Sequence, residues 1–147
     1  MMKMPGIIVG IDGSARSHQA LEWAVREAGI RNAPLTVLTV QPAVVSFYST
    51  TAVAYPGDYD LTERTRKAAL AETEEVLDQV ANDPHPTSVA VQAVLGVPAE
   101  ELLRAAADAD MIVVGSRGAG GFEKLLLGSV SSYAVHHGDC PVVVIPS

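Results

Sequence analysis

Glycine and hydroxyl residues gather in one segment of the 147-residue chain, where Gly115-Ser-Arg-Gly118 is followed by Ala-Gly-Gly121 and Gly128-Ser129. The segment begins where an apolar run typical of a buried strand ends, and it finishes where a helical pattern starts. Glycines at such a position let backbone amides approach a ligand, and a helix N-terminus adds free N–H groups and a positive dipole end. The pattern favours a phosphate-binding loop; a plain glycine-rich turn is the alternative.

A second polar position, Asp12, follows the apolar run Ile7–Ile11 within the sequence Gly10-Ile-Asp-Gly-Ser14. A carboxylate there can accept hydrogen bonds from ribose hydroxyls, and a helix-capping aspartate in a tight turn is the alternative. In open parallel sheets, ligands bind beyond the carboxyl ends of the strands, where the strand order reverses. Because Asp12 and the glycine-rich segment both follow strand ends, the two loops could face one crevice.

The elements that would position these residues alternate between short apolar runs and helical patterns. Strands are expected at Ile7–Ile11, Leu35–Val40, Thr87–Val94, Met111–Gly115 and Val142–Ile145. Helices are expected from a cap at Ser14 or Ser17 to Gly29, over Leu61–Ala81 with Thr62 as a cap, from Pro98 to about Ala107, and over Ser129–His137. Strands that are apolar throughout need cover on both faces, so the sequence predicts a single α/β domain with a mainly parallel sheet.

The stretch Gln41–Asp60 holds two prolines, three tyrosines and Gly57, and it is expected to be irregular. The four histidines are scattered, and the adjacent pair His136 and His137 would point about 100° apart on a helix, which is unsuitable for chelation. No metal ligand is therefore assigned.

The charge, the cysteine content and the apolar runs of the chain indicate which partners and which cellular location to expect. Asp and Glu number 17 against 10 Lys and Arg, and the net charge of −7 argues against nucleic acid or an anionic membrane as the main partner. The single cysteine, Cys140, cannot form an internal disulfide, which is typical of a reducing compartment. No apolar run reaches the roughly 18 residues of a spanning helix, and the first residues lack a signal-peptide pattern. A cytoplasmic location is expected.

The chain resembles the universal stress protein family, in its ATP-binding subclass. The family signature is Gly, two residues, Gly, nine residues, Gly, then Ser or Thr, and here it is Gly115, Gly118, Gly128 and Ser129. The opening IIVGIDGSARSHQALEWA and the ending LLLGSVSSYAVHHGDCPVVVIP are also similar to the family. The resemblance implies one such domain over residues 1–147, an open doubly wound sandwich whose five-stranded parallel sheet has the order 3-2-1-4-5 and helices on both faces.

The resemblance also implies a ligand, namely ATP or a related adenine nucleotide (ADP or AMP), with Mg²⁺ as a candidate to share the phosphate charge. It assigns Asp12 to the ribose, the backbone of Val40 to adenine, and Gly10 to the pocket lining. The sugar and phosphates fall to Gly115, Ser116, Arg117, Gly118, Ala119, Gly120, Gly121, Gly128, Ser129, Val130 and Ser131. Some relatives carry a cation just before the Gly-Ser pair, where this chain has Leu125-Leu-Leu127; Arg117 and Lys124 are the nearby cations.

Two functions of different class follow. The first is a regulatory stress-response module that binds ATP; the second is a slow ATP-hydrolysing or other ATP-using enzyme of the same fold. The chain lacks G-x-x-x-x-G-K-[ST], and Val114 replaces the first glycine of a hydrolase nucleophile elbow. No general base or activated nucleophile is visible beside the glycine loop, so the binding module is favoured and no catalytic residue is assigned.

The last expected strand, Val142–Ile145, is apolar on both faces and would lie at a sheet edge in the family's strand order. An exposed apolar edge must be covered or paired. The sequence and the resemblance together predict a homodimer in which two such strands pair antiparallel across a twofold axis. The alternative is an edge covered by the chain's own stretch Gln41–Asp60.

Overall fold

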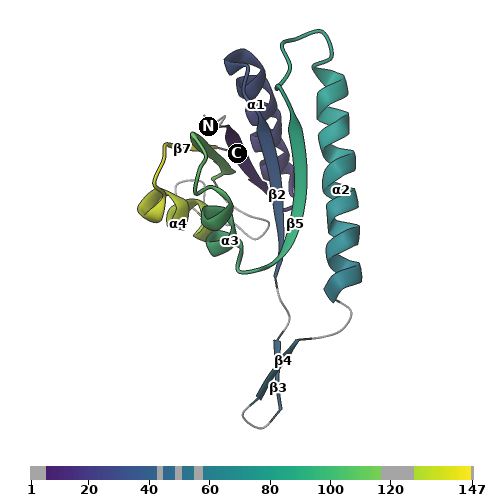
Figure 1. The fold of residues 1–147 in the computed structure, drawn as a ribbon, viewed down its shortest axis with the longest axis vertical. Coiled ribbons are helices and arrows are strands. Elements are labelled where there is room, and N and C mark those ends of the chain that lie inside the picture. Colours follow the sequence, from purple (N-terminus) through teal and green to yellow (C-terminus); the bar gives the residue numbers. More distant parts are fainter. Residues whose placement is uncertain (1–5, 43–44, 49–50, 55–57, 117–127, 147) are drawn as a thin grey trace.

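A computed structural model describes residues 6–42, 45–48, 51–54, 58–116 and 128–146. Five parallel strands form one sheet in the order β5-β2-β1-β6-β7 (Figure 1). These strands are β1 (Ile7–Ile11), β2 (Leu35–Pro42), β5 (Val89–Gly96), β6 (Met111–Gly115) and β7 (Val142–Ile145). Counted along the sheet-forming strands this is the order 3-2-1-4-5, so the doubly wound fold is confirmed.

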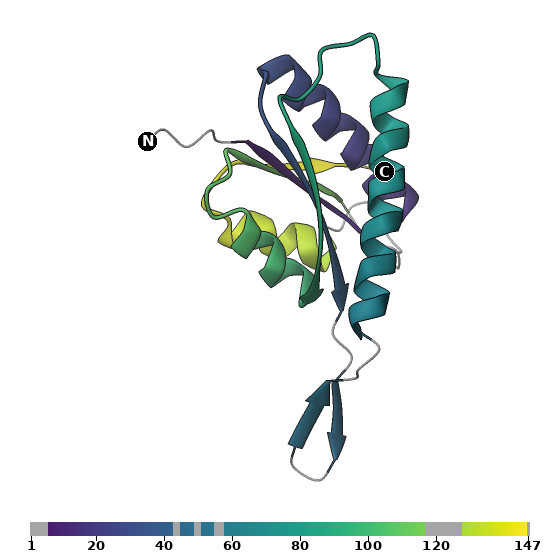
Figure 2. The ribbon, with the colours of Figure 1, turned by 45° about the vertical axis from the view of Figure 1, so that its right-hand side comes forward.

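Two pairs of helices cover the two faces of the sheet (Figure 2). Helices α1 (Ala15–Arg31) and α2 (Asp58–Gln79) pack on one face, and α3 (Pro98–Ala105) and α4 (Ser129–His137) pack on the other. Successive strand residues point to opposite faces. Val9 of β1 is therefore buried beneath α1 and α2, whereas its neighbour Ile8 is buried with Leu102 of α3. This double burial explains why the strands are apolar throughout.

The strand register leaves part of β2 unpaired at the carboxyl end of the sheet. β1 ends at Ile11, which lies opposite Thr39 of β2. β2 continues to Pro42 beside β5, where Pro42 lies opposite Gly96. Within the described sheet, the segment Val40–Pro42 therefore has a strand neighbour on its β5 side and none on its β1 side. The strand order reverses beside this open edge, which is where open α/β sheets bind ligands.

Helix α1 begins as predicted but ends later than predicted. Ser14 caps it, because the Ser14 hydroxyl accepts a hydrogen bond from the Ser17 N–H at 3.2 Å. The helix continues past Gly29 to Arg31, and its C-cap is Asn32, whose φ of 54° is left-handed. Gly29 has another role, because a Cβ at this position would overlap the Pro84 carbonyl. The glycine therefore allows close packing of the chain against the helix.

The prediction of an irregular stretch over Gln41–Asp60 is largely wrong. β3 (Val45–Tyr48) and β4 (Thr51–Ala54) form an antiparallel hairpin that extends away from the sheet in both views (Figures 1 and 2). Valine, phenylalanine, tyrosine and threonine favour strands, which explains these two runs. Helix α2 starts at Asp58, so Thr62 lies inside the helix and cannot be its cap. None of the helices in the described part of the chain could span a membrane.

Candidate functional site

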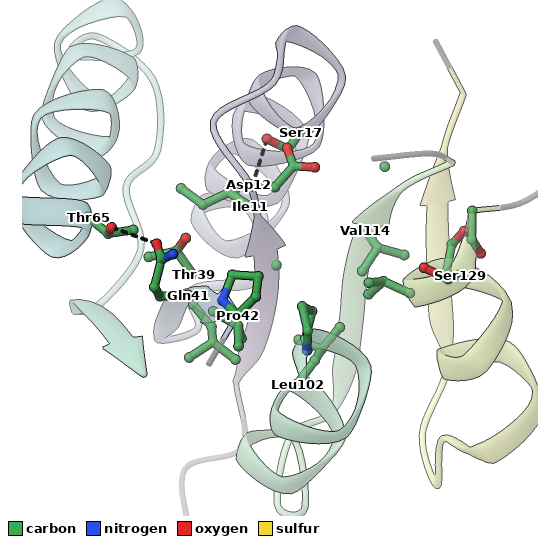
Figure 3. Close-up of a pocket in the computed structure, with 18 residues that line it drawn as sticks. Ile11, Asp12, Ser17, Thr39, Gln41, Pro42, Thr65, Leu102, Val114 and Ser129 are labelled. Atoms are coloured by element: carbon green, nitrogen blue, oxygen red, sulfur yellow. Dashed lines mark hydrogen bonds between the residues drawn. The ribbon is translucent and has the colours of Figure 1, made fainter. Parts of the chain in front are cut away.

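A pocket of about 420 Å³ opens at the carboxyl ends of β1, β2 and β6, beside the N-terminus of α4 (Figure 3). It brings together both loops that the sequence singled out. Eight of the predicted site residues line it: Gly10, Asp12, Val40, Gly115, Gly128, Ser129, Val130 and Ser131. Ser116 lies next to the pocket and is buried. The other five, Arg117, Gly118, Ala119, Gly120 and Gly121, lie outside the described residues, as does Lys124.

The Asp12 carboxylate is held in a tight turn at the start of α1. Its Oδ1 accepts a hydrogen bond from the Ser14 N–H at 2.9 Å, and its own backbone N–H donates to the Ser17 hydroxyl at 3.1 Å. Gly13, at a φ of +83°, makes the turn possible, since residues with a side chain rarely adopt that conformation. The helix cap is Ser14, so the alternative of Asp12 as a capping residue is wrong. The exposed Asp12 carboxylate is a fixed hydrogen-bond acceptor at the pocket.

The N-terminus of α4 forms another side of the pocket. Gly128 is its N-cap residue and supplies no side-chain cap, in contrast to Ser14 at α1. The Gly128 N–H donates to the Ser116 carbonyl at 2.6 Å, and the buried Ser131 hydroxyl lies 2.9 Å from the same carbonyl. These bonds tie α4 to the end of β6. The first-turn amides of a helix have no intrahelical acceptors and lie at its positive end, so they suit an anion.

Ser131 and Ser129 therefore differ in what they can offer to a ligand. The Ser131 hydroxyl is engaged within the protein, so its backbone N–H is the group suited to a ligand. The Ser129 side chain is exposed at the pocket, so its hydroxyl and its N–H are both suited to one.

Apolar side chains wall the pocket below the strand ends. Leu38 and Leu102 lie there, each only 2% exposed, together with Val40, Val114 and Val130. Gly10 keeps the space between them open. A Cβ at Gly10 would meet the Leu102 methyls at 3.5 Å and Val114 at 3.7 Å, which is ordinary contact. The fold would therefore tolerate a Cβ at this position, and we infer that the glycine keeps this part of the pocket open.

Sequence reasoning assigned four polar lining residues no place in the site: Ser17, Thr39, Gln41 and Thr65. Gln41 lies near the end of β2, and Thr65 lies in the second turn of α2. The Thr65 hydroxyl lies 3.2 Å from Gln41 Oε1 (Figure 3). Gln41 was assigned to an irregular stretch and was not considered for the site. The available signal was its place directly after Val40, a residue already assigned to the ligand.

The described lining carries little charge. Asp12 is the only titratable side chain among the described residues of the pocket wall. His18 is engaged elsewhere, since its ring nitrogens lie 3.2 Å from Glu22 and 3.3 Å from Glu72. His136 contacts the Ser132 carbonyl at 2.7 Å, and the ring of His137 lies against that of Tyr133, with the centroids 4.4 Å apart and the planes tilted by 41°. No group of three or more metal-ligating side chains occurs in the part of the chain that the structure describes.

Cys140 lies between α4 and β7, outside the pocket lining. Burial raises the pKa of its thiol, and the nearby carboxylates of Asp110 and Asp139 raise that pKa further. A raised pKa reduces the thiolate fraction, and the thiolate is the reactive form. We expect Cys140 to react with iodoacetamide at pH 7.5 more slowly than a free cysteine in an unstructured peptide. Mass spectrometry of a timed reaction measures this rate, and labelling faster than the peptide would contradict the environment described.

The sheet order and the position of the pocket define a doubly wound α/β protein. Its candidate ligand site lies at the switch point, the place in the sheet where the strand order reverses. The chain belongs to the universal stress protein family, whose model matches residues 4–146. The family to which the sequence was assigned by resemblance is thus confirmed.

Curated relatives support this membership. The chain is 34% identical over 145 residues to a universal stress protein of Mycolicibacterium smegmatis, covering 95% of this chain and 47% of that protein. It is 33% identical over 146 residues to one of Mycobacterium bovis, covering 99% and 49%. The chain spans about half the length of these curated relatives.

Solved structures share the fold. The universal stress protein UspA from Lactobacillus plantarum superposes with a TM-score of 0.69 at 26% identity, over 99% of both chains. A universal stress protein in complex with cAMP gives a TM-score of 0.67 at 23% identity, over 97% of both chains. The universal stress protein from Archaeoglobus fulgidus in complex with dAMP gives 0.65 at 22% identity, over 99% of both chains. At these last two identities the likeness shows the fold alone.

Proposed function

We propose that this domain binds an adenine nucleotide (ATP, ADP or AMP) in the switch-point pocket and acts as a regulatory module of the stress response. The observation that carries the proposal is that three features suited to a nucleotide line the same cavity, which is of nucleotide size. These features are a helix N-terminus without a side-chain cap, a fixed carboxylate acceptor and apolar walls. Two structures of the same fold hold cAMP and dAMP, which supports adenine as the base.

Each part of the nucleotide has a counterpart in the pocket. The base lies between the apolar walls, against the open edge of β2 at Val40. The ribose hydroxyls donate to Asp12, and the phosphates accept from the Ser129 hydroxyl and from the first-turn amides of Ser129, Val130 and Ser131. The remaining predicted loop residues, Arg117 to Gly121, complete the phosphate site in this proposal. Because the described lining supplies dipoles and no cation, Mg²⁺ would share the phosphate charge.

Calorimetric titration of the purified domain with ATP, ADP and AMP tests the proposal. In parallel, any nucleotide that co-purifies with the protein is released by heat denaturation and identified. We expect saturable binding of at least one adenine nucleotide. The absence of binding for all three at millimolar concentration would overturn it. Phosphate release from saturating ATP and Mg²⁺ distinguishes a binding module from an ATP-using enzyme, and we expect little turnover.

Asp12→Asn should weaken nucleotide binding by about 1–3 kcal/mol, the scale of a hydrogen bond lost from a charged group. Any turnover should fall only as far as occupancy falls. Titration and phosphate release at saturating ATP measure the two effects. Ser14→Ala is the matched control, because it removes the helix cap and keeps the N–H that bonds Asp12. A large loss of kcat at full occupancy in Asp12→Asn would assign a catalytic role to this carboxylate.

Gly10→Ala should lower nucleotide affinity while the fold is kept. The added Cβ makes ordinary contacts with Leu102 and Val114, and it occupies space that we assign to the ligand. We expect affinity to fall about tenfold or more, the scale of overpacking a filled site. Thermal melting checks the fold and calorimetry measures the affinity. Unchanged affinity would mean that the ligand does not reach this part of the pocket.

We also propose that the domain forms a homodimer through β7. This strand pairs with β6 on one side, and within the described sheet it has no neighbour on the other. All four of its residues, Val142–Ile145, are partly exposed. Antiparallel pairing with a second copy would provide hydrogen-bond partners for the backbone N–H and C=O groups on the open edge between Pro141 and Pro146.

A further inference from the structure

Gln41 and Thr65 form a polar pair at one end of the pocket. In Figure 3 this pair lies on the opposite side of the pocket from Ser129, and Asp12 lies between them in that view. If the phosphates lie at α4 and the ribose at Asp12, the far edge of the base points toward this pair. Both residues come from elements that fix them, since Gln41 is paired within β2 and Thr65 is in α2.

The single proton of the Thr65 hydroxyl decides which end of the Gln41 carboxamide faces the ligand. The Thr65 hydroxyl has one proton and two acceptors within reach, the Leu61 carbonyl at 2.8 Å and Gln41 Oε1 at 3.2 Å. It cannot donate fully to both. Half a turn about the terminal bond of Gln41 brings the NH₂ group toward Thr65. The hydroxyl then donates to Leu61 and accepts from Gln41, so both contacts become full hydrogen bonds.

We propose that Gln41 reads the base of the bound nucleotide with its carbonyl oxygen, and that Thr65 is the positioning residue that holds the carboxamide in this orientation. This inference rests on the proposed function and adds the base selectivity of the same site. A carbonyl oxygen accepts a hydrogen bond from the 6-amino group of adenine. It repels the 6-oxo group of hypoxanthine, because both atoms are acceptors.

ATP and ITP share the ribose and the phosphates. Their bases differ at the 6-position and at N1, which carries a proton in hypoxanthine but not in adenine, so the ratio of the two dissociation constants reports how the protein reads this edge of the base. We expect the unmodified protein to favour ATP by about tenfold, the upper range of one net hydrogen bond. Gln41→Leu should bring the two affinities to within about threefold of each other, since one partner of that bond is removed. Thr65→Val should also lower the ratio, because the carboxamide is no longer held.

Thr73→Val is the matched control. Thr73 lies on the same helix, and like Thr65 its hydroxyl donates to the carbonyl four residues earlier, that of Ala69, at 2.7 Å. Unlike Thr65, it is buried in the core away from the pocket. Its ATP-to-ITP ratio should equal that of the unmodified protein. Melting curves of all variants separate lost folding from lost selectivity.

The outcomes separate this inference from the proposed function. Tight ATP binding with a ratio that Gln41→Leu leaves unchanged would overturn the base-reading role and keep the nucleotide site. A preference of the unmodified protein for ITP would show that the Gln41 carbonyl oxygen does not select the 6-amino group, which also overturns the inference. Failure of both nucleotides to bind would overturn the proposed function and the inference with it.

Discussion

Gly128→Glu should abolish nucleotide binding and leave the domain folded. Gly128 is the N-cap of α4 and lines the pocket, and its φ of −70° is accessible to any residue. The backbone therefore does not require glycine here. A glutamate would put a negative charge and a long side chain where we propose the phosphates bind. Like charges brought together in a binding site cost several kcal/mol, so affinity should fall by about 100-fold or more.

Gly128→Ser is the control that separates charge from the mere presence of a side chain. Serine is a favoured N-cap residue and should stabilise α4. Its hydroxyl would compete with the phosphates for the first-turn amides, so a smaller loss of affinity is expected than for glutamate. Calorimetry with ATP measures both variants, and thermal melting checks their folding. If Gly128→Glu binds ATP as tightly as the unmodified protein, the phosphates do not lie at α4.

Val143→Lys should convert the proposed homodimer into a monomer. Val143 is in the middle of β7, and a lysine there would bring two like charges together across the twofold axis. Light scattering at high micromolar concentration should give twice the chain mass of 15.4 kDa for the unmodified protein and a single chain mass for the variant. Val143 also contacts the core beneath α1, so melting curves are needed to verify folding.

The unmodified protein provides the second arm of this test, which does not depend on how the variant folds. A monomer at high micromolar concentration would rule out pairing through β7. A dimer that Val143→Lys leaves intact would place the interface elsewhere on the surface.

The elements with clear boundaries in the sequence were predicted to the residue. β1, β6, α4 and β7 match their expected ranges, because glycines, prolines or polar turn residues flank three short apolar runs and one helical segment. The strand order had a different source. Periodicity does not encode which strands are neighbours, so the order came from the family resemblance and was then confirmed.

Other features depend on tertiary contacts that the sequence does not display. Gly29 was interpreted as a helix end, yet its role is set by Pro84, which passes close to α1. The hairpin β3–β4 lies between prolines and tyrosines that favoured a loop. Gln41 and Thr65 are 24 positions apart and meet because α2 packs beside the end of β2. The predicted site residues beyond Ser116 in the glycine loop stay predictions.

An NMR titration with ATP and Mg²⁺ tests the central claim most directly, since backbone amide shifts report both binding and its location. We predict saturable shifts at Asp12, Val40 and Ser129 to Ser131. A smaller pocket of about 260 Å³ at the opposite end of the sheet, lined by Thr36 and Ala109, is an internal control whose amides should not shift. No shifts at millimolar ATP, or shifts gathered at that second pocket, would contradict a nucleotide site at the switch point.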